Sequence, residues 1–456
     1  MVTHSSVQDR RLSSTLAPLP PLVPGLPIVG SALSMARNPL QFFLTHYHRY
    51  GSVFRVRVLH QECTVLGGLE VNQFLVNGDE VFPSKDAFAA LAREYGTERL
   101  LPAMDGPTHQ RRRKLQRPSY SRERLYARLP EMLRLTEEML QGWKPGDSIA
   151  VFPTLQRIIV QQLGLILLNR PPQDTFAAVR TLVQFNMFVT ILGFLPSLPL
   201  RWPTYVRAKA RVLTFCADSI EEHRAIPATQ RIPDLVDALL EERDEAGNPF
   251  SDRDIIGEMM GSFFAGMDTV SGTCSFMLYA ILKTPGLLAQ VQEEIDQAFT
   301  GESFDARRLK AMPVLHAVAL ETLRRYPIAP ITPRTVGQPF EIAGYRLEPG
   351  ARVFLVNGLT HFLPEYFPEP ERFDIGHFTP DARRARPANA FAPFALGAHT
   401  CLGAGLAETQ IIVLISLLLH TFELALDPPG LEVKMLFRPA PTPGAKFRVK
   451  VVRRRQ

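Results

Sequence analysis

Cysteine is scarce in this sequence, and tryptophan is scarcer. The 456 residues include four cysteines and two tryptophans. The cysteines stand far apart and form no CxxC pair, which argues against a disulfide framework and against a zinc knuckle. They are Cys63, Cys216, Cys274 and Cys401. A reducing compartment fits this usage, and we expect a cytoplasmic protein.

Long apolar runs near the start and strong charge are also missing. The first twenty residues are polar and then proline-rich, with no apolar core of signal-peptide length and nothing near the ~20 residues of a membrane helix. The net charge of +6 is too diffuse to argue for nucleic acid, and no aromatic-basic RNA-binding motif is present. Peripheral contact with a membrane stays open.

The chain does have a substantial apolar fraction. Apolar residues make up 46% and charged residues 21%, as in soluble globular proteins. Neither internal repeats nor a long low-complexity linker divides the sequence. We therefore expect one domain over residues 1–456, with residues 1–20 flexible and no second catalytic unit attached.

One cysteine stands in an unusual setting. Residues 391–408, FAPFALGAHTCLGAGLAE, place Cys401 between Gly397 and Gly403 and directly before an apolar helical run. A cysteine flanked by glycines at the start of a helix is a candidate thiolate metal ligand. An inert buried cysteine is the usual alternative.

The longest predicted helix begins at Ser251, which can cap it, and runs to about Lys283, a span of ~50 Å. Its middle is apolar nearly all round and should be buried. Burying Asp268 and Thr269, which lie near Gly266, therefore costs free energy unless their polar groups form hydrogen bonds. We expect a distorted turn there, with backbone carbonyls open to water or ligand. The alternative is a threonine bonded back to its own helix and a paired aspartate.

A short helical segment concentrates positive charge. Residues 108–118, THQRRRKLQRP, contain five basic side chains. His109 and Arg113 lie four apart, so they share one helix face and could jointly grip an anionic group. A solvated face is the usual alternative. The side chains expected to face outward as a docking patch are Arg111, Arg112, Lys114 and Arg117.

Two segments are expected to be irregular. Residues 81–106 are expected to form either a surface loop that packs in a small cluster of its own or one wall of a substrate pocket. Residues 191–203, ILGFLPSLPLRWP, form a proline-broken apolar loop. Such a loop either marks an interaction site or is tucked into the core, and the sequence favours neither.

In their order and spacing, these segments resemble the cytochrome P450 family, the haem-thiolate monooxygenases. The haem-loop pattern FxxGxxxCxG is met by Phe394, Gly397, Cys401 and Gly403. The oxygen-binding helix pattern is met by Ala265, Gly266, Asp268 and Thr269. The ExxR pattern and the PERF arginine are Glu321, Arg324 and Arg372. Each motif alone is weak, but the four in this order are very specific, and the resemblance covers the chain from about residue 20.

The resemblance implies a fold and a cofactor. The fold would be mainly α with small β-sheets (α+β), a single P450 catalytic domain with haem b (iron protoporphyrin IX) between the long central helix and the cysteine-loop helix. Cys401 would ligate the iron, and its thiolate would favour breaking the O–O bond of bound oxygen. Gly397 and Gly403 would bring backbone close to the porphyrin and aim amides at the sulfur. Phe394 would pack near the thiolate, and Ala265 would lie on the opposite side of the haem.

It also implies roles for the polar residues. Thr269 and Asp268 would relay protons during oxygen activation. Glu321, Arg324 and Arg372 would form a buried structural triad. The positions expected to bind the haem propionates are His109, Arg113, Arg334 and His399. At the last of these the family more often has arginine, and the charge of a histidine depends on pH.

The implied activity is insertion of one oxygen atom from O2 into a lipophilic substrate: a terpenoid, steroid, fatty acid or polyketide. Electrons would come from a separate ferredoxin or flavodoxin and its NAD(P)H reductase. A peroxide-driven peroxygenase and a non-enzymatic haem sensor are the alternatives, and the Asp268-Thr269 pair counts against both. The expected pocket residues are Phe88, Phe185, Phe188, Phe264, Ala265, Ala329, Ile331 and Thr442.

Overall fold

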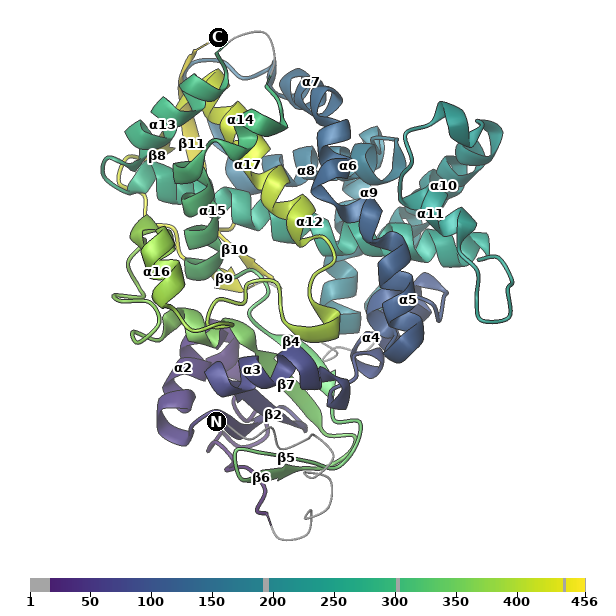
Figure 1. Ribbon diagram of the computed structural model, residues 1–456, viewed down its shortest axis with the longest axis vertical. Coiled ribbons are helices and arrows are strands. Elements are labelled where there is room, and N and C mark those ends of the chain that lie inside the picture. Colours follow the sequence, from purple (N-terminus) through teal and green to yellow (C-terminus); the bar gives the residue numbers. More distant parts are fainter. Residues whose placement is uncertain (1–16, 192–196, 301–303, 438–439, 456) are drawn as a thin grey trace.

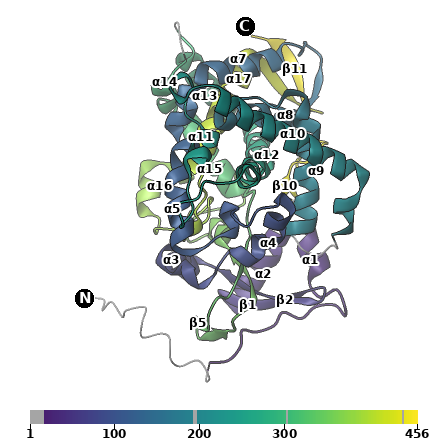
Figure 2. The same cartoon turned by 90° about the vertical axis from the view of Figure 1, so that its right-hand side faces the viewer.

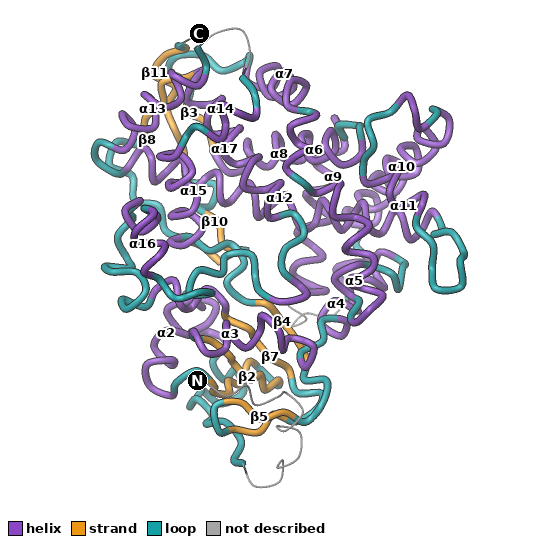
Figure 3. The backbone as a smooth tube through the Cα atoms, viewed as in Figure 1, coloured by secondary structure: helices purple, strands orange, loops and turns teal. Residues whose placement is uncertain are grey.

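The computed structural model describes residues 17–191, 197–300, 304–437 and 440–455. The flexibility expected for residues 1–20 falls almost wholly outside these ranges. Helices fill most of the molecule (Figure 3). The α-helices of the described residues are α1 Ala32–Arg37, α2 Pro39–Tyr50, α3 Leu69–Gly78, α4 Lys85–Tyr95, α5 Gly106–Gln116, α6 Arg122–Ala127, α7 Leu129–Leu140, α8 Val151–Leu168, α9 Phe176–Asn186, α10 Pro203–Ala225, α11 Leu235–Glu241, α12 Asp252–Lys283, α13 Leu287–Ala298, α14 Ala306–Lys310, α15 Pro313–Arg325, α16 Pro380–Ala385 and α17 Ala404–Thr421.

The strands are short and lie in small sheets, so the predicted mainly α fold with small β-sheets is confirmed. They are β1 Val53–Val58, β2 Gln61–Gly67, β3 Ser148–Ala150, β4 Thr332–Thr335, β5 Phe340–Ile342, β6 Tyr345–Leu347, β7 Arg352–Val356, β8 Phe422–Asp427, β9 Leu436–Phe437, β10 Pro441–Thr442 and β11 Arg448–Arg454.

Helix α12 crosses the middle of the molecule in Figure 1 and is viewed end-on in Figure 2. The Ser251 side chain accepts a hydrogen bond from the Asp254 amide, and the Asp254 side chain accepts one from the Ser251 amide, which together form a capping box. The sequence predicts the cap at Ser251. The apolar residues of α12 pack against α8, α17, α15 and α10 and form the largest hydrophobic core. Because it is buried on so many sides, α12 fixes the positions of the helices around it.

The expected distorted turn in α12 does not form. The helix is continuously α from end to end. Thr269 donates its hydroxyl proton to the carbonyl of Ala265 at 2.6 Å, one turn back. Thr273 does the same to Thr269 at 2.9 Å. The hydroxyl groups thus bond to backbone carbonyls of α12 without breaking the hydrogen bonds of the helix. A threonine bonded back to its own helix is the alternative that the sequence offers to a distorted turn.

A four-stranded sheet in the order β1-β2-β7-β4 forms the lower part of Figure 1. β2 pairs antiparallel with β1 and parallel with β7. Alternate strand residues point to opposite faces. One face packs on α2 through Phe43, and the other packs on α3 through Leu75. The sheet thereby holds α3, and the turn that follows it, against the cysteine loop.

Helix α4 corrects the expectation that residues 81–106 are irregular. Its residues Leu91, Ala92 and Tyr95 are buried along one side, and Gly96 ends it in a left-handed conformation (φ 77°). In the apolar loop, residues 192–196 lie outside the described ranges. Leu198 and Trp202, which are described, are 61% and 53% exposed.

Two segments are long and apolar enough to cross a membrane by length and composition: α8 and Gly397–Thr421. The bent pair of α12 and α13 also meets these criteria if it is counted as one span. Within the molecule, 78% of the α8 stretch and 67% of the other are buried. Their apolar character is therefore accounted for by core packing.

Candidate active site

The cysteine loop, residues 391–403, is closed by its own backbone. The Cys401 amide donates to the carbonyl of Phe394 at 2.8 Å. The Thr400 hydroxyl donates to the carbonyl of Gly397 at 2.8 Å. The amide of Gly403 donates to the Cys401 thiol, which favours its ionised form. The loop therefore presents one sulfur atom at the start of α17 in a fixed position.

The residues packed around Gly397 leave no room for a side chain at this position. Its φ is +77°, and a Cβ there would lie 2.4 Å from a carboxylate oxygen of Asp79 and from the carbonyl of Leu75. Asp79 also accepts the Ala398 amide at 2.7 Å. The amide at the sulfur is therefore that of Gly403. Gly397 is needed so that the loop can pack against α3 and the turn after it.

Cys401 faces an interior space. It is the exposed cysteine of the four. Yet desolvation by the surrounding protein raises the pKa of its thiol, against the Gly403 amide and Arg113, which lower it. A side chain that is accessible and also desolvated lines a hollow rather than the outer surface. On α12, Ala265 is likewise exposed, although Phe263 and Met267 beside it are buried.

The polar pair on α12 is split between two faces. Thr269 stands one turn after Ala265 on the accessible face and is half-buried. Asp268 is buried and accepts a hydrogen bond from Nε2 of Gln156 on α8 at 2.6 Å. Burial raises the pKa of the Asp268 carboxyl, and the Gln156 bond and Arg180 oppose this shift. The acid is thus held behind the helix, away from Ala265.

Four nitrogen-bearing side chains predicted to bind the haem propionates gather together. This cation cluster comprises His109, Arg113, Arg334 and His399. The rings of His109 and His399 stack with centroids 4.2 Å apart. Arg113 donates to the carbonyl of Thr400 at 2.6 Å, next to Cys401.

Two carboxylates border the cation cluster, and the sequence analysis missed both. Asp105 accepts from Nε2 of His399 at 2.9 Å and from the amides of Ser84 and Lys85. Although burial opposes it, these bonds hold the pKa of Asp105 at about 2. Asp79 attracts Arg334 from the other side. Asp105 directly precedes a predicted helix, which suggests a cap rather than a partner for a histidine.

The cation cluster retains unused capacity to bind an anion. Burial, His399 and Arg113 lower the pKa of His109 to about 3, and its buried Nδ1 has no hydrogen-bond partner. Arg334 is 7% exposed, and desolvation lowers its pKa to about 10. Among the described residues its side chain has one hydrogen bond, to the carbonyl of Pro333. A buried imidazole nitrogen without a partner and a buried guanidinium without an ion pair among the described residues suit an added anionic group.

The predicted structural triad forms with a different third member. Glu321 and Arg324 are fully buried and joined by two bonds of 2.8 and 2.7 Å. The side chain of Arg372 is exposed and pairs with Glu369, while its carbonyl accepts from Arg324 at 3.0 Å. The third side chain is His377, whose Nδ1 lies 3.2 Å from Glu321. Arg372 therefore does not belong to a buried triad by its side chain.

The expected pocket residues lie on elements that meet. Helix α4 with Phe88 contacts α12, β4 and the π-helical turn 187–191 that carries Phe188, and β10 with Thr442 contacts α12. Ala329 is exposed just before β4, Ile331 is half-buried beside the sheet core, and Phe264 is half-buried beside Ala265. Phe185 differs, because its ring packs on Trp202 and Tyr205. These contacts turn Phe185 toward α10.

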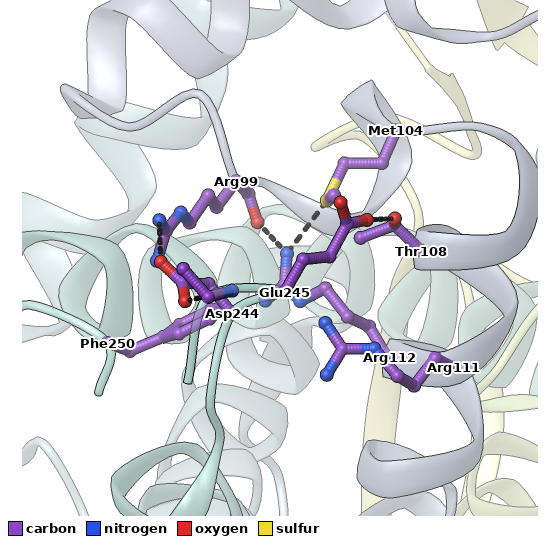
Figure 4. A pocket seen from close by; sticks show the side chains of 9 residues that line it. Arg99, Met104, Thr108, Arg111, Arg112, Asp244, Glu245 and Phe250 are labelled. Carbon is purple, nitrogen blue, oxygen red and sulfur yellow. Dashed lines mark hydrogen bonds and ion pairs between the residues drawn. The ribbon is translucent and has the colours of Figure 1, made fainter. Parts of the chain in front are cut away.

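Arg112 corrects the expected docking patch. Arg111, Lys114 and Arg117 are exposed as predicted, but Arg112 is 1% exposed. It pairs with Glu242 and with Glu258 at 2.8 Å. Both carboxylates are more than a hundred residues away along the chain, so no local pattern could reveal them. A surface pocket of about 310 Å³ opens beside this cluster (Figure 4). It is lined by Arg99, Met104, Thr108, Arg111, Arg112, Asp244, Glu245, Ala246 and Phe250.

Replacing Arg112 by methionine is expected to destabilise the protein by about 3–5 kcal/mol at pH 8, because two buried carboxylates lose their common partner. Burial raises the pKa of Glu258 to about 7, and Arg112 lowers it. Without Arg112 the pKa rises further, so the folded state must keep a proton that the unfolded state releases. The deficit should therefore shrink at pH 6. Urea unfolding at both pH values measures it.

Arg111→Met is the matched control, since Arg111 is exposed and bonds only the carbonyl of Arg243 among the described residues. It should change stability by less than about 1 kcal/mol at either pH. A loss of stability in Arg112→Met that does not depend on pH would contradict the explanation that folded Glu258 keeps a proton when Arg112 is removed.

Comparison with known proteins assigns the class that this thiol and helix arrangement defines. The family model "Cytochrome P450" matches residues 20–448. The chain belongs to the cytochrome P450 family, as its motifs predict, and is a haem-b monooxygenase of that family.

Several relatives span nearly the whole chain. Putative cytochrome P450 139 of Mycobacterium bovis is 28% identical over 401 residues, covering 83% of this chain and 90% of that protein. Pentalenene oxygenase of Streptomyces avermitilis is 27% identical, with 88% and 90% covered. Abscisic acid 8'-hydroxylase 4 of Arabidopsis thaliana is 25% identical, with 96% and 93% covered.

Solved structures share the fold. Cyanobacterial CYP120A1 with bound retinoic acid superposes with a TM-score of 0.83 at 24% identity, covering 95% of this chain and 99% of that one. The cytochrome P450DA heme domain gives 0.84 at 22% identity, covering 96% and 98%.

The residues of the cysteine loop and of α12 fit haem b. The loop offers a thiol with an amide aimed at its sulfur, and Ala265 is exposed on α12, which packs against the helix that follows the loop. The cation cluster offers a buried ring nitrogen and a desolvated guanidinium where two carboxylate groups of a cofactor could bind.

Proposed function

We propose that this enzyme inserts oxygen from O2 into a lipophilic small molecule, with terpenoids as the first class to test. The observation that carries the proposal is the accessible but desolvated Cys401 thiol beside the Gly403 amide, in a chain of the cytochrome P450 family. Relatives named for oxidation of pentalenene and abscisic acid support the terpenoid class. The half-buried aromatic residues Phe88 and Phe264 support an apolar ligand.

In this proposal Cys401 holds the iron, and the cation cluster holds the propionates. Haem, when bound, supplies the oxygen chemistry, to which a thiolate ligand contributes electron density. The Gly403 amide stabilises the thiolate by its hydrogen bond. Arg113 bonds the loop beside the sulfur and so fixes the loop to α5.

Thr269 and Asp268 supply protons to the hollow. The Thr269 proton is committed to the Ala265 carbonyl at 2.6 Å, so its oxygen lone pairs remain free to accept. Asp268, on the next position of the helix, is a carboxyl group whose pKa burial raises toward the working range of a general acid. Asp268 is bonded toward α8 rather than toward Thr269, so it must turn before it can donate to the Thr269 oxygen.

Electrons are proposed to come from a separate ferredoxin or flavodoxin with its NAD(P)H reductase. The support is the exposed basic side chains of Arg111, Lys114 and Arg117 on α5, the helix whose Arg113 contacts the cysteine loop. They would steer an acidic carrier toward the thiolate side. The four cysteines form no disulfide among the described residues, which supports a cytoplasmic location.

The experiment that tests the proposal is a ligand screen on the haem-loaded protein. Terpenoids, steroids, fatty acids and polyketides are titrated while the haem absorbance is recorded, and binders are then incubated with ferredoxin, reductase and NAD(P)H. An oxygenated product is expected from at least one binder. Turnover with peroxide alone that exceeds turnover with electron carriers would instead indicate a peroxygenase. Binding without any turnover would indicate a sensor.

Thr269→Ala is expected to lower product formed per NAD(P)H consumed by about 100-fold, the lower end of what a positioned proton-transfer group contributes. Consumption of NAD(P)H should continue, with peroxide as the main product. Thr273→Ala is the matched control, since it removes a hydroxyl that bonds the same helix one turn later. Equal coupling in the two variants would contradict the role of Thr269.

A further inference from the structure

Gln156 on α8 bonds the buried carboxyl group of α12. It is 2% exposed, and its Nε2 donates to Oδ1 of Asp268 at 2.6 Å. Two neighbours on α8 use their amides for packing between elements. Gln161 bonds Gln173 before α9, and Gln162 bonds Thr136 of α7. Gln156 instead donates its amide hydrogen to Asp268, which carries the single carboxyl group in the buried middle of α12.

Helix α8 packs closely on α12 at Gly266. A Cβ at Gly266 would lie 2.8 Å from Cδ1 of Leu163, so a larger residue there would require the Leu163 side chain to shift. Asp268 therefore turns toward α8, whereas Ala265 and Thr269 line the accessible face of the helix. In this position the carboxyl group is on the wrong side of α12 to give a proton to Thr269.

Few groups act on the Asp268 carboxyl group. Oδ2 has no hydrogen-bond partner among the described residues. Burial raises its pKa, while the Gln156 donor and the positive charge of Arg180 on α9 lower it. Arg180 has no ion-pair partner within the described ranges, and Asp268 keeps 7% of its surface exposed. No other titratable group on the helices packed against α12 contributes to the shift.

We propose that Gln156 is a positioning residue for proton delivery: it holds the ionised Asp268 carboxylate behind α12 and releases the protonated acid toward Thr269. The inference rests on the proposed role of Asp268. An N–H bond to a carboxylate is about twice as strong as one to a neutral carboxyl group, so protonation weakens the hold. The acid then turns and gives its proton to the Thr269 oxygen, while the Thr269 hydroxyl leaves the Ala265 carbonyl and passes its own proton into the active site. Asp268 returns as carboxylate to Gln156. The next proton comes from solvent.

The test is the titration of Asp268 itself. Infrared difference spectra of the haem-loaded protein against its Asp268→Asn variant isolate the Asp268 carboxyl band, which is followed from pH 4 to 9. In Gln156→Leu the midpoint is expected about one to two pH units above that of the unmodified protein, because a hydrogen bond to a charged group is lost. Gln161→Leu removes a buried amide from the same helix and should leave the midpoint unchanged.

Proton delivery is measured separately, without substrate. With ferredoxin, its reductase and NAD(P)H, the share of consumed O2 released as peroxide is expected to rise at least twofold in Gln156→Leu and to stay constant in Gln161→Leu. If Gln156→Leu does not load haem, Gln156→Glu keeps the volume and should also raise the midpoint, since two carboxyl groups then share the site. Identical midpoints in the Gln156 variants and the unmodified protein would overturn the inference. An upward midpoint shift with no effect of Asp268→Asn on peroxide release would instead overturn the proposed role of Asp268.

Discussion

Replacing Cys401 by serine is expected to abolish monooxygenase activity and the thiolate signature of the reduced carbon monoxide complex. A serine hydroxyl remains protonated near neutral pH and cannot supply the electron density of a thiolate. The loop itself should persist, because its bonds are made by the Phe394 carbonyl, the Gly397 carbonyl and the Cys401 amide. The loss should therefore reflect the ligand rather than the fold. Absorbance of the reduced protein under carbon monoxide measures it directly.

Cys63→Ser is the matched control for this result. Cys63 is buried in β2, in a hydrophobic cluster that includes none of the described residues of the cysteine loop. Its replacement should lower stability by about 1–3 kcal/mol through a buried hydroxyl while leaving the spectrum unchanged. A thiolate spectrum in Cys401→Ser would show that another residue binds the iron.

Arg324→Leu is expected to lower the free energy of unfolding by at least about 3–5 kcal/mol, because it leaves Glu321 buried without its partner. It also removes the donors that bond the carbonyls of His361 and Pro370 at 2.9 and 2.7 Å. Domains have only about 5–15 kcal/mol of stability, so most of the expressed variant should be unfolded or aggregated. Urea unfolding and the yield of haem-loaded protein measure the effect.

Two neighbouring arginines provide controls. Arg325 follows Arg324 directly and is half-buried where it pairs with the exposed Glu371, and Arg372 forms an exposed pair with Glu369. Replacing either by leucine should change stability by less than about 1 kcal/mol. The Arg372 result separates the sequence prediction, a buried triad member, from the structure. A deficit at Arg372 as large as that at Arg324 would contradict the arrangement seen here.

The sequence predicts well those features that are local or apolar. The cap at Ser251 and the apolar middle of α12 define that helix without any tertiary information. Glu321 and Arg324 are three residues apart on one helix, so their pairing follows from helix geometry. The cysteine loop is short and rich in glycine, and its spacing, in order with the three other motifs, predicts the class of the protein.

Features that depend on distant residues were not predictable. Arg112 lies among five basic side chains, and its burial depends on Glu242 and Glu258 from other helices. Arg372 lies in an irregular meander and His377 in the short 3-10 turn Ile375–Phe378 after it, where no periodicity tells which side chain turns inward. Helix α4 was missed because its apolar residues were assigned to an irregular wall. Gly96, which ends α4 in a left-handed conformation, is the feature of the sequence that indicates a helix end at this position.

The parallel pairing of β2 with β7 has a consequence for how the chain is made. The sheet closes between segments far apart in sequence, and the bond from Asn72 to the carbonyl of Asn357 spans 285 residues. During synthesis at roughly 5–20 residues per second, the free edge of β2 waits on the order of tens of seconds for its neighbour. Over that time β1 and β2 form an open-edged hairpin that can pair with other nascent chains. Yield in a recombinant host should therefore depend on translation rate and chaperone supply before it depends on any property of the finished enzyme.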